Sequence, residues 1–148
     1  MSDHKDPIVI TGAARTPMGG FQGDLSPVTA PELGGAAITA AVKRSGVAPE
    51  DVDEVIMGLC LFAGLGQAPS RQAAHHAGIP WDTGCTTISK MCGSAMKAAM
   101  QAHDGILAGS STVTVAGGME NMSQAPHVIR DAREGMRFGR PPQIEDSL

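Results

Sequence analysis

Two kinds of hydrophobic run alternate along most of the chain. Short runs rich in β-branched residues, typical of buried strands, occupy residues 7–15, 52–58, 85–89 and 111–118. Longer runs of small and apolar residues, with the length of helices, lie between them. This alternation, with glycine at many of the joints, predicts an α/β fold in which helices cover a mostly parallel sheet.

The expected helices carry boundary signals. The first opens with Thr29 and Glu32, which have the spacing of a capping box, and closes at Gly46. The second covers residues 69–77. The third covers residues 92–107 and is apolar on nearly every face, so we expect a buried central helix that carries a cysteine at its start.

The alternating pattern stops after Gly118. The remaining residues are irregular and more charged. We therefore expect two parts, an α/β core over residues 1–118 and an irregular connecting segment over residues 119–148.

Composition narrows the classes of protein and partner. The 148 residues are enough for one hydrophobic core, and 42% hydrophobic with 18% charged residues is typical of a folded chain. The formal net charge is −4 and lysine and arginine form no basic block, so nucleic acid and anionic membrane surfaces are poor candidate partners. No apolar run is long enough for insertion into a membrane.

The cysteines and the first residues bear on location. Three cysteines without a CxxC pair do not indicate a disulfide framework, so a reducing compartment is expected. The polar start MSDHKDP shows no signal or transit peptide. The cytoplasm is therefore the expected location.

Neither a metal nor a nucleotide is expected. Adjacent His75 and His76 point to different faces of a helix and lack the i, i+4 spacing of a helical zinc pair. The glycine loops MGGFQG and GLGQAP lack the lysine of a P-loop and the full G-x-G-x-x-G spacing.

The stretch TTISKMCGSAMKAAM, residues 86–100, carries the candidate chemistry. Cys92 lies at the expected start of the third helix, where backbone N–H groups lack partners and the helix dipole is positive. A thiolate is stabilised at such a position and is then a better nucleophile. Gly93 allows a substrate to approach closely, and Ser94 can accept from an unpaired N–H. The residues alone favour the other interpretation, a cysteine that serves as a small core residue.

Two histidines are candidate bases for this thiol. His103 is on the same helix but too far along to touch Cys92, and His127 would need the irregular segment to fold back. We expect neither to act. Cys60 and Cys85 are expected to be core residues.

Six stretches, taken together and in this order, resemble the N-terminal part of a thiolase. They are VITGAARTPMGGFQG, PELGGAAI, VDEVIMG, AGLGQAPSRQAA, TTISKMCGSAMKA and VAGGMENMSQAPH. The resemblance implies a layered αβαβα fold of two similar halves with a loop domain inserted in the first, of which this chain would hold an incomplete N-terminal half. It also implies a homo-oligomer, a dimer or tetramer, for the complete protein.

The same resemblance implies an activity. Thiolases cleave 3-ketoacyl-CoA with coenzyme A or, in reverse, condense two acetyl-CoA molecules. Cys92 would be the catalytic nucleophile that takes the acyl group as a thioester, and Glu120 would support the site by hydrogen bonding. Acyl-CoA and coenzyme A would be the substrates, with no further cofactor. We expect an acetyl-CoA C-acetyltransferase, with a degradative 3-ketoacyl-CoA thiolase as the alternative.

The chain departs from the family pattern in two ways. Ser89 and Ala95 stand where thiolases usually have asparagine and glycine, which bears on the shape of the acyl pocket. The Gly-His-Pro and Cys-x-Gly-Gly-Gly stretches that carry the family's base histidine and acid cysteine do not occur. We therefore expect a truncated product or one piece of an enzyme completed by another chain. A second hypothesis is a chain without turnover that associates with itself or with a partner.

Overall fold

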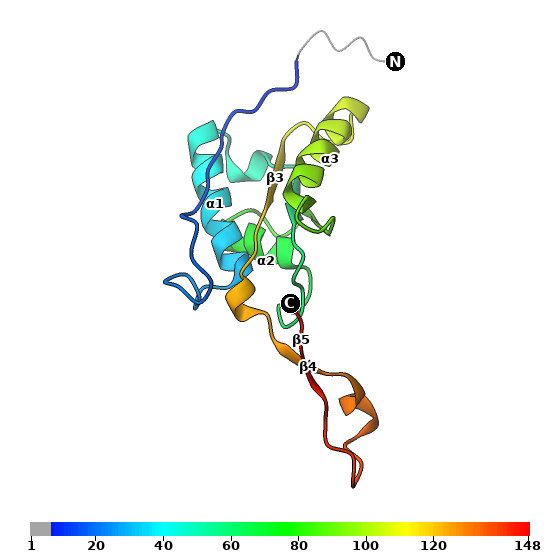
Figure 1. The fold of residues 1–148 in the computed structure, drawn as a ribbon. Coiled ribbons are helices and arrows are strands. Elements are labelled where there is room, and N and C mark those ends of the chain that lie inside the picture. Colours follow the sequence, from blue (N-terminus) through cyan, green and yellow to red (C-terminus); the bar gives the residue numbers. More distant parts are fainter. Residues whose placement is uncertain (1–6) are drawn as a thin grey trace.

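A three-stranded parallel sheet with helices on both faces forms the body of the protein (Figure 1). The structure is a computed structural model that describes residues 7–148. The strands are β1 (Glu54–Gly58), β2 (Gly84–Ile88) and β3 (Thr114–Gly118), paired in the order β2-β1-β3. The helices are α1 (Ala30–Ser45), α2 (Pro69–His76) and α3 (Ser94–Ala108). The predicted α/β class with a mostly parallel sheet is confirmed. The prediction about a signal or transit peptide concerns residues 1–6, which lie outside the described residues.

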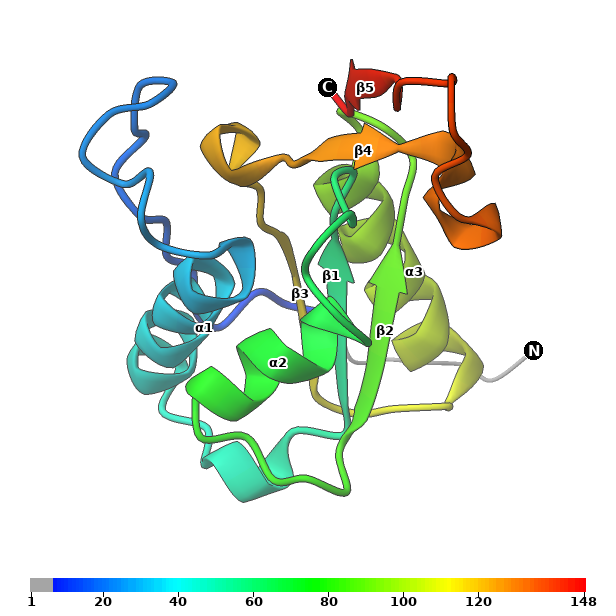
Figure 2. The ribbon, with the colours of Figure 1, turned by 90° about the horizontal axis from the view of Figure 1, so that it is seen from below.

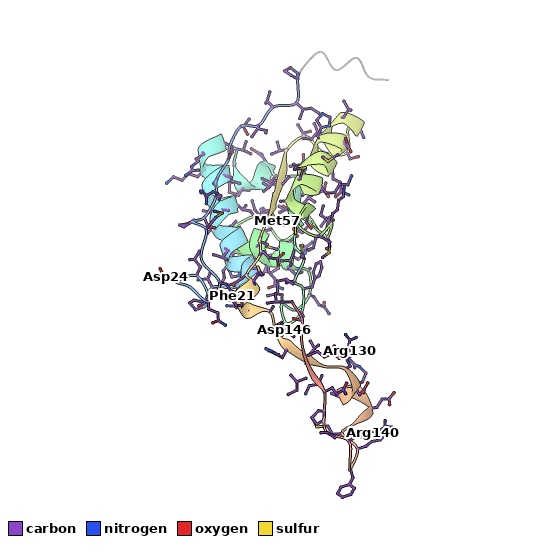
Figure 3. All side chains as sticks on the ribbon, viewed as in Figure 1. Phe21, Asp24, Met57, Arg130, Arg140 and Asp146 are labelled. Atoms are coloured by element: carbon purple, nitrogen blue, oxygen red, sulfur yellow. The ribbon has the colours of Figure 1, made fainter. Side chains whose placement is uncertain are left out.

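Helices α1 and α2 cover one face of the sheet and α3 covers the other (Figure 2). Alternating side chains of β1 build the two cores. Val55 and Met57 point toward α1 and α2 and are fully buried, and Ile56 packs against Ala98 of α3. Figure 3 labels Met57 in the middle of these layers. Because β1 is the central strand of a parallel sheet, it is buried on both faces and reads as a continuous apolar run.

Helix α1 begins and ends where the sequence predicts. The Thr29 side chain accepts a hydrogen bond from the Glu32 N–H, and the Glu32 carboxylate accepts one from the Thr29 N–H at 2.8 Å. Hydrogen bonds from the side chain and then the backbone of Thr29 lower the pKa of the Glu32 carboxyl. At the other end Gly46 adopts the left-handed conformation, with φ 74°, and closes the helix.

Strands β1 and β3 begin slightly later than predicted. Just before them, the Asp53 carboxylate accepts the N–H groups of Thr112 and Val113 at 2.7 and 3.0 Å. The backbone hydrogen bonds from Val113 and then Thr112 lower the pKa of the Asp53 carboxyl. A side chain therefore joins the starts of the two strands.

The predicted strand over residues 7–15 does not form. The segment runs beside α1 (Figure 1) and pairs with no strand of the described chain. Val9 and Ile10 are 65% and 90% exposed, and the segment is tied to α1 through Arg44, which donates to the Ala13 carbonyl at 2.6 Å. The segment is non-helical, as its apolar pattern predicts, but a strand also needs a neighbouring strand that hydrogen-bonds to its N–H and C=O groups.

Helix α3 is buried on one side only, so the prediction of a buried central helix is wrong for residues 7–148. Ala98 and Ala102 pack on the sheet, whereas Met96 and Met100 are 72% and 52% exposed. The helix also begins at Ser94, two residues later than predicted. The sheet covers one face of α3, and no described segment covers the other.

After β3 the chain leaves the layers as an arm (Figure 1). A 3₁₀ turn at Met122–Gln124 leads to β4 (His127–Ile129), which pairs antiparallel with β5 (Ile144–Asp146). Another 3₁₀ turn, Arg130–Glu134, lies between these strands. Figure 3 labels Arg130 and Arg140 along this arm. The arm contains more regular structure than the irregular segment expected there; the division of the chain into two parts at residue 118 stays a prediction.

None of the helices within residues 7–148 has the length and hydrophobicity needed to cross a bilayer.

Candidate active site

The candidate residues follow the ends of the three parallel strands, which lie at one edge of the sheet. Cys60 is two residues after β1, Cys92 four residues after β2, and Glu120 two residues after β3. The carboxyl edge of a parallel sheet is the usual place for a site in open α/β folds. Residues far apart in sequence therefore converge there because of the sheet topology.

Glu120 braces the loop that follows β1. Its carboxylate oxygens accept the N–H of Cys60 at 2.8 Å and the N–H of Leu61 at 3.1 Å. The loop after β1 and the end of β3 are thereby fixed to each other. Both hydrogen bonds of Glu120 go to the loop after β1 and neither goes to Cys92. A contribution of Glu120 to the chemistry stays a prediction.

Cys92 is on a tight turn between β2 and α3, not in the first turn of the helix as predicted. Two backbone bonds close this turn, from the Gly93 N–H to the Lys90 carbonyl and from the Ser94 N–H to the Met91 carbonyl, each 3.0 Å long. Met91 has φ 48°, the left-handed region that residues with a side chain rarely adopt. The turn leaves Cys92 exposed to solvent just before the positive end of α3.

Ser94 holds this turn from beneath. The hydroxyl accepts the Lys90 N–H at 2.8 Å and donates to the Met91 carbonyl, and it lies 3.6 Å from the Cys60 sulfur. The prediction that Ser94 serves an unpaired N–H of the helix is wrong, because its partner precedes the helix. The only sequence signal for the hydrogen bonds of Ser94 to the turn is a serine two residues after the cysteine.

Glycines at the strand ends let α3 approach the sheet. A Cβ added to Gly58 would lie 2.4 Å from the Ser94 carbonyl carbon, and one added to Gly118 would lie 2.6 Å from the Ala95 Cβ. The Ala95 methyl, which replaces the family's usual glycine, is therefore accommodated because Gly118 has no side chain. The two glycines place the start of α3, and with it the turn of Cys92, against the strands.

The three thiols differ in environment. Cys92 is exposed, whereas Cys60 and Cys85 are partly buried and all three are free. Cys85 packs against the main core, and burial raises the pKa of its thiol. The expectation that Cys85 is a core residue is confirmed, while Cys60 lies at the site instead of in either core cluster.

The histidines take other roles. The His75 ring lies against the Trp81 ring with centroids 4.0 Å apart, and His103 contacts Asp104 at 3.3 Å. His127 lies on β4 of the arm. Within residues 7–148 no three metal-ligating side chains come together.

An open cavity of about 240 Å³ adjoins the site at Glu120. The loop over residues 15–26 forms one wall and residues 120–123 form the other. The Gln22 N–H donates to the Ser123 hydroxyl at 2.7 Å and joins the two walls. No local sequence pattern indicates this cavity, because its walls are about 100 residues apart.

Two features define this chain: a parallel α/β fold, and an exposed cysteine on the turn that leads from β2 to α3 at the carboxyl edge of the sheet. Residues 8–146 match the family model described as thiolase, N-terminal domain, and the chain belongs to this family. The predicted resemblance to the N-terminal portion of a thiolase is confirmed.

Acetyl-CoA acetyltransferases are among the similar proteins. The enzyme of that name from Cupriavidus necator is 54% identical, over 95% of this chain and 36% of its own length. Acetyl-CoA acetyltransferase 2 of Arabidopsis thaliana is 52% identical, over 95% of this chain and 35% of its own length. The mouse protein named acetyl-CoA acetyltransferase, cytosolic, is 47% identical over the whole of this chain and 37% of its own length. The chain thus spans roughly a third of the length of these curated relatives.

The fold matches a solved thiolase. The crystal structure of Acat5 thiolase from Ascaris suum in complex with coenzyme A superposes with a TM-score of 0.88 at 37% identity, over 94% of this chain and 36% of that one. The predicted thiolase-like fold is confirmed by this match.

Proposed function

We propose that this chain is the nucleophile-bearing part of a thiolase that transfers acyl groups to and from coenzyme A, with acetyl-CoA C-acetyltransfer as the reaction. The observation that carries the proposal is the exposed Cys92 thiol on a fixed turn before α3, beside the loop that Glu120 braces. The names of the relatives support acetyl-CoA as the substrate.

The chemistry follows from a thiolate at position 92. Its sulfur attacks the carbonyl carbon of an acyl-CoA thioester, a new carbon–sulfur bond forms, and the bond to coenzyme A breaks so that coenzyme A leaves as a thiolate that takes up a proton. In the second half of the condensation a base removes a proton from the methyl carbon of a second acetyl-CoA, and the resulting carbanion attacks the acyl carbon and displaces the Cys92 thiolate. Thiolysis runs in reverse: the Cys92 sulfur attacks the 3-keto carbon of acetoacetyl-CoA, the carbon–carbon bond breaks, and the released acetyl-CoA carbanion takes up a proton. Deprotonated coenzyme A then displaces the acetyl group from Cys92. The positive end of the 15-residue helix α3 favours the anionic sulfur in both halves.

Turnover needs groups outside the described site. The N–H groups of Gly93 and Ser94 already donate to the turn, so an acyl oxygen must find its donors elsewhere. Positioned general acid–base catalysis typically supplies about 10²–10⁴-fold. Because the family's base and acid stretches do not occur in the sequence, we expect slow acylation and little turnover from this chain alone.

Mass spectrometry after incubation with acetyl-CoA or acetoacetyl-CoA tests the proposal. We expect an acetyl group on the peptide that contains Cys92, its loss in Cys92→Ala, and its retention in the matched control Cys85→Ala. No acetylation of the wild-type chain, or equal acetylation of Cys60 and Cys92, would contradict the nucleophile assignment. Parallel incubation with a long-chain 3-ketoacyl-CoA separates the alternative degradative thiolase, which would acylate Cys92 with the longer group.

The second candidate function is association: this chain would have no catalytic turnover and would bind another chain or a second copy of itself. The observation that favours it is the outer face of α3, where Met96, Met100 and Leu107 are 72%, 52% and 51% exposed. An apolar helix face of this kind is typically covered by a partner surface. Light scattering during size-exclusion chromatography of the wild type and of Met96→Lys tests this second candidate. Association that the substitution abolishes supports it. Robust acetoacetyl-CoA thiolysis by a purified monomer contradicts it. The homo-oligomeric state and the cytoplasmic location stay predictions.

A further inference from the structure

The turn that carries Cys92 has a backbone shape that its own sequence disfavours. Met91 adopts φ 48°, where its Cβ is crowded by the backbone, and no glycine or asparagine stands there to relieve the cost. Such a conformation persists only where the surroundings impose it. Met91 is 71% exposed, so packing of its side chain does not impose it.

Ser94 supplies the constraint. Its hydroxyl bonds to both sides of the strained residue, accepting from the Lys90 N–H at 2.8 Å and donating to the Met91 carbonyl. The hydrogen bonds and the sulfur contact of this hydroxyl go to Lys90, Met91 and Cys60, all of which precede α3. The Ser94 hydroxyl therefore stabilises the turn and not the start of the helix.

Ser94 is itself anchored to the sheet. It is 4% exposed, and a Cβ on Gly58 at the end of β1 would lie 2.7 Å from its Cβ. The Cys60 sulfur lies 3.6 Å from its hydroxyl, in the loop that Glu120 fixes. A continuous series of contacts thus runs from the end of β1 through Ser94 to the turn.

We propose that Ser94 is the positioning residue for Cys92. Its hydroxyl holds Met91 in the left-handed conformation and thereby determines where the Cys92 thiol points and how close it lies to the start of α3. The proposal rests on Cys92 being the nucleophile of the proposed function. Without the hydroxyl, the Lys90 N–H and the Met91 carbonyl lose their partner, Met91 relaxes to a right-handed or extended conformation, and the sulfur moves away from the positive end of α3.

The experiment measures the rate of carbamidomethylation by iodoacetamide at each cysteine of the 148-residue chain at neutral pH, by mass spectrometry. We expect Ser94→Ala to lower the Cys92 rate about five- to tenfold, the factor that corresponds to one lost net hydrogen bond. The rate at Cys85 should not change. Ser45→Ala is the matched control, because the Ser45 hydroxyl also bonds two backbone groups of one turn, at the end of α1.

Substitutions at the exposed Met91 keep the proposal testable if Ser94→Ala does not fold. Met91→Gly adopts a positive φ freely and should restore most of the Cys92 rate when combined with Ser94→Ala. Met91→Val, with Ser94 intact, should lower the Cys92 rate because a β-branched residue resists this conformation. Cys92 rates in Ser94→Ala and Met91→Val that equal the wild type, or a loss that Met91→Gly does not recover, overturn the proposal.

Acetylation by acetyl-CoA, measured on the same variants, separates the two proposals. Acetylation of the wild type that Ser94→Ala leaves unchanged refutes the positioning role alone. No acetylation of the wild type refutes the proposed function, and with it the reason for the positioning role.

Discussion

Replacement of Gly58 with alanine tests whether the close approach of α3 to the sheet places Cys92. The glycine ends β1 directly beneath the start of α3. A Cβ there would lie 2.4 Å from the Ser94 carbonyl carbon and 2.5 Å from the Ala95 nitrogen, whereas ordinary contact begins at 3.4 Å. Both neighbours are backbone atoms, so no side-chain rotation relieves the overlap. The start of α3 must withdraw by about 1 Å, and the turn that carries Cys92 must move with it.

The expected cost follows from this overlap. An extra carbon forced into a packed site typically costs about 1–3 kcal/mol. Alanine also reduces the freedom of the unfolded chain, which offsets about 0.4–1 kcal/mol where the conformation is compatible. The net loss for Gly58→Ala is then about 1–2 kcal/mol, which for a chain of this length lowers Tm by about 2–8 °C.

Two measurements and one control make this prediction specific. Thermal unfolding followed by circular dichroism gives Tm, and the iodoacetamide rate at Cys92 reports the position of the thiol. Gly84→Ala is the matched control, because Gly84 also lies in the parallel sheet but the atom nearest to its added Cβ is the Asp53 carbonyl oxygen at 3.8 Å. We expect Gly58→Ala to lower both Tm and the Cys92 rate, and Gly84→Ala to change neither by a comparable amount. Equal behaviour of the two variants would refute the claim that backbone contact at Gly58 positions the helix.

Two further predictions concern carboxylates that accept paired backbone N–H groups. In Glu120→Gln one of the N–H groups of Cys60 and Leu61 faces an amide donor, so we expect the free energy of unfolding to fall by about 1 kcal/mol. Hydrogen exchange at both amides, followed by NMR, should become faster. Unchanged protection of the two amides would contradict the bracing role of Glu120. For Asp53 the hydrogen bonds lower the folded-state pKa, so its stabilisation is fully present above the unfolded value of about 3.9 and is lost as the pH falls through the lower folded value. Asp53→Asn should therefore be less stable than the wild type at pH 7, and urea unfolding should show that the difference in free energy of unfolding narrows below about pH 4. A difference that does not depend on pH would show that the charge of Asp53 plays no part.

The sequence by itself determined the class of fold and most element boundaries. The capping box of Thr29 and Glu32 and the closing Gly46 are local signals, and α1 obeys them because the bonds that define its ends join residues at most four apart. The apolar run at β1 was likewise predictable, since it reflects burial on both faces of a parallel sheet, whereas the edge strands β2 and β3 are only partly buried. Cys92 and Glu120 were named from the sequence, although their roles rest on resemblance to the family.

Only the tertiary structure decided how these parts meet. Residues 7–15 have the composition of a strand, but pairing depends on a neighbour that no local pattern supplies. The outer face of α3 has the composition of a buried surface and is exposed, because burial depends on what covers a helix and not on the helix itself. The site shows the same division. Sheet topology, through contacts across about 60 residues, brings Glu120 to the Cys60 loop, and the approach of Ser94 to Gly58 imposes on Met91 a backbone shape that its own sequence opposes.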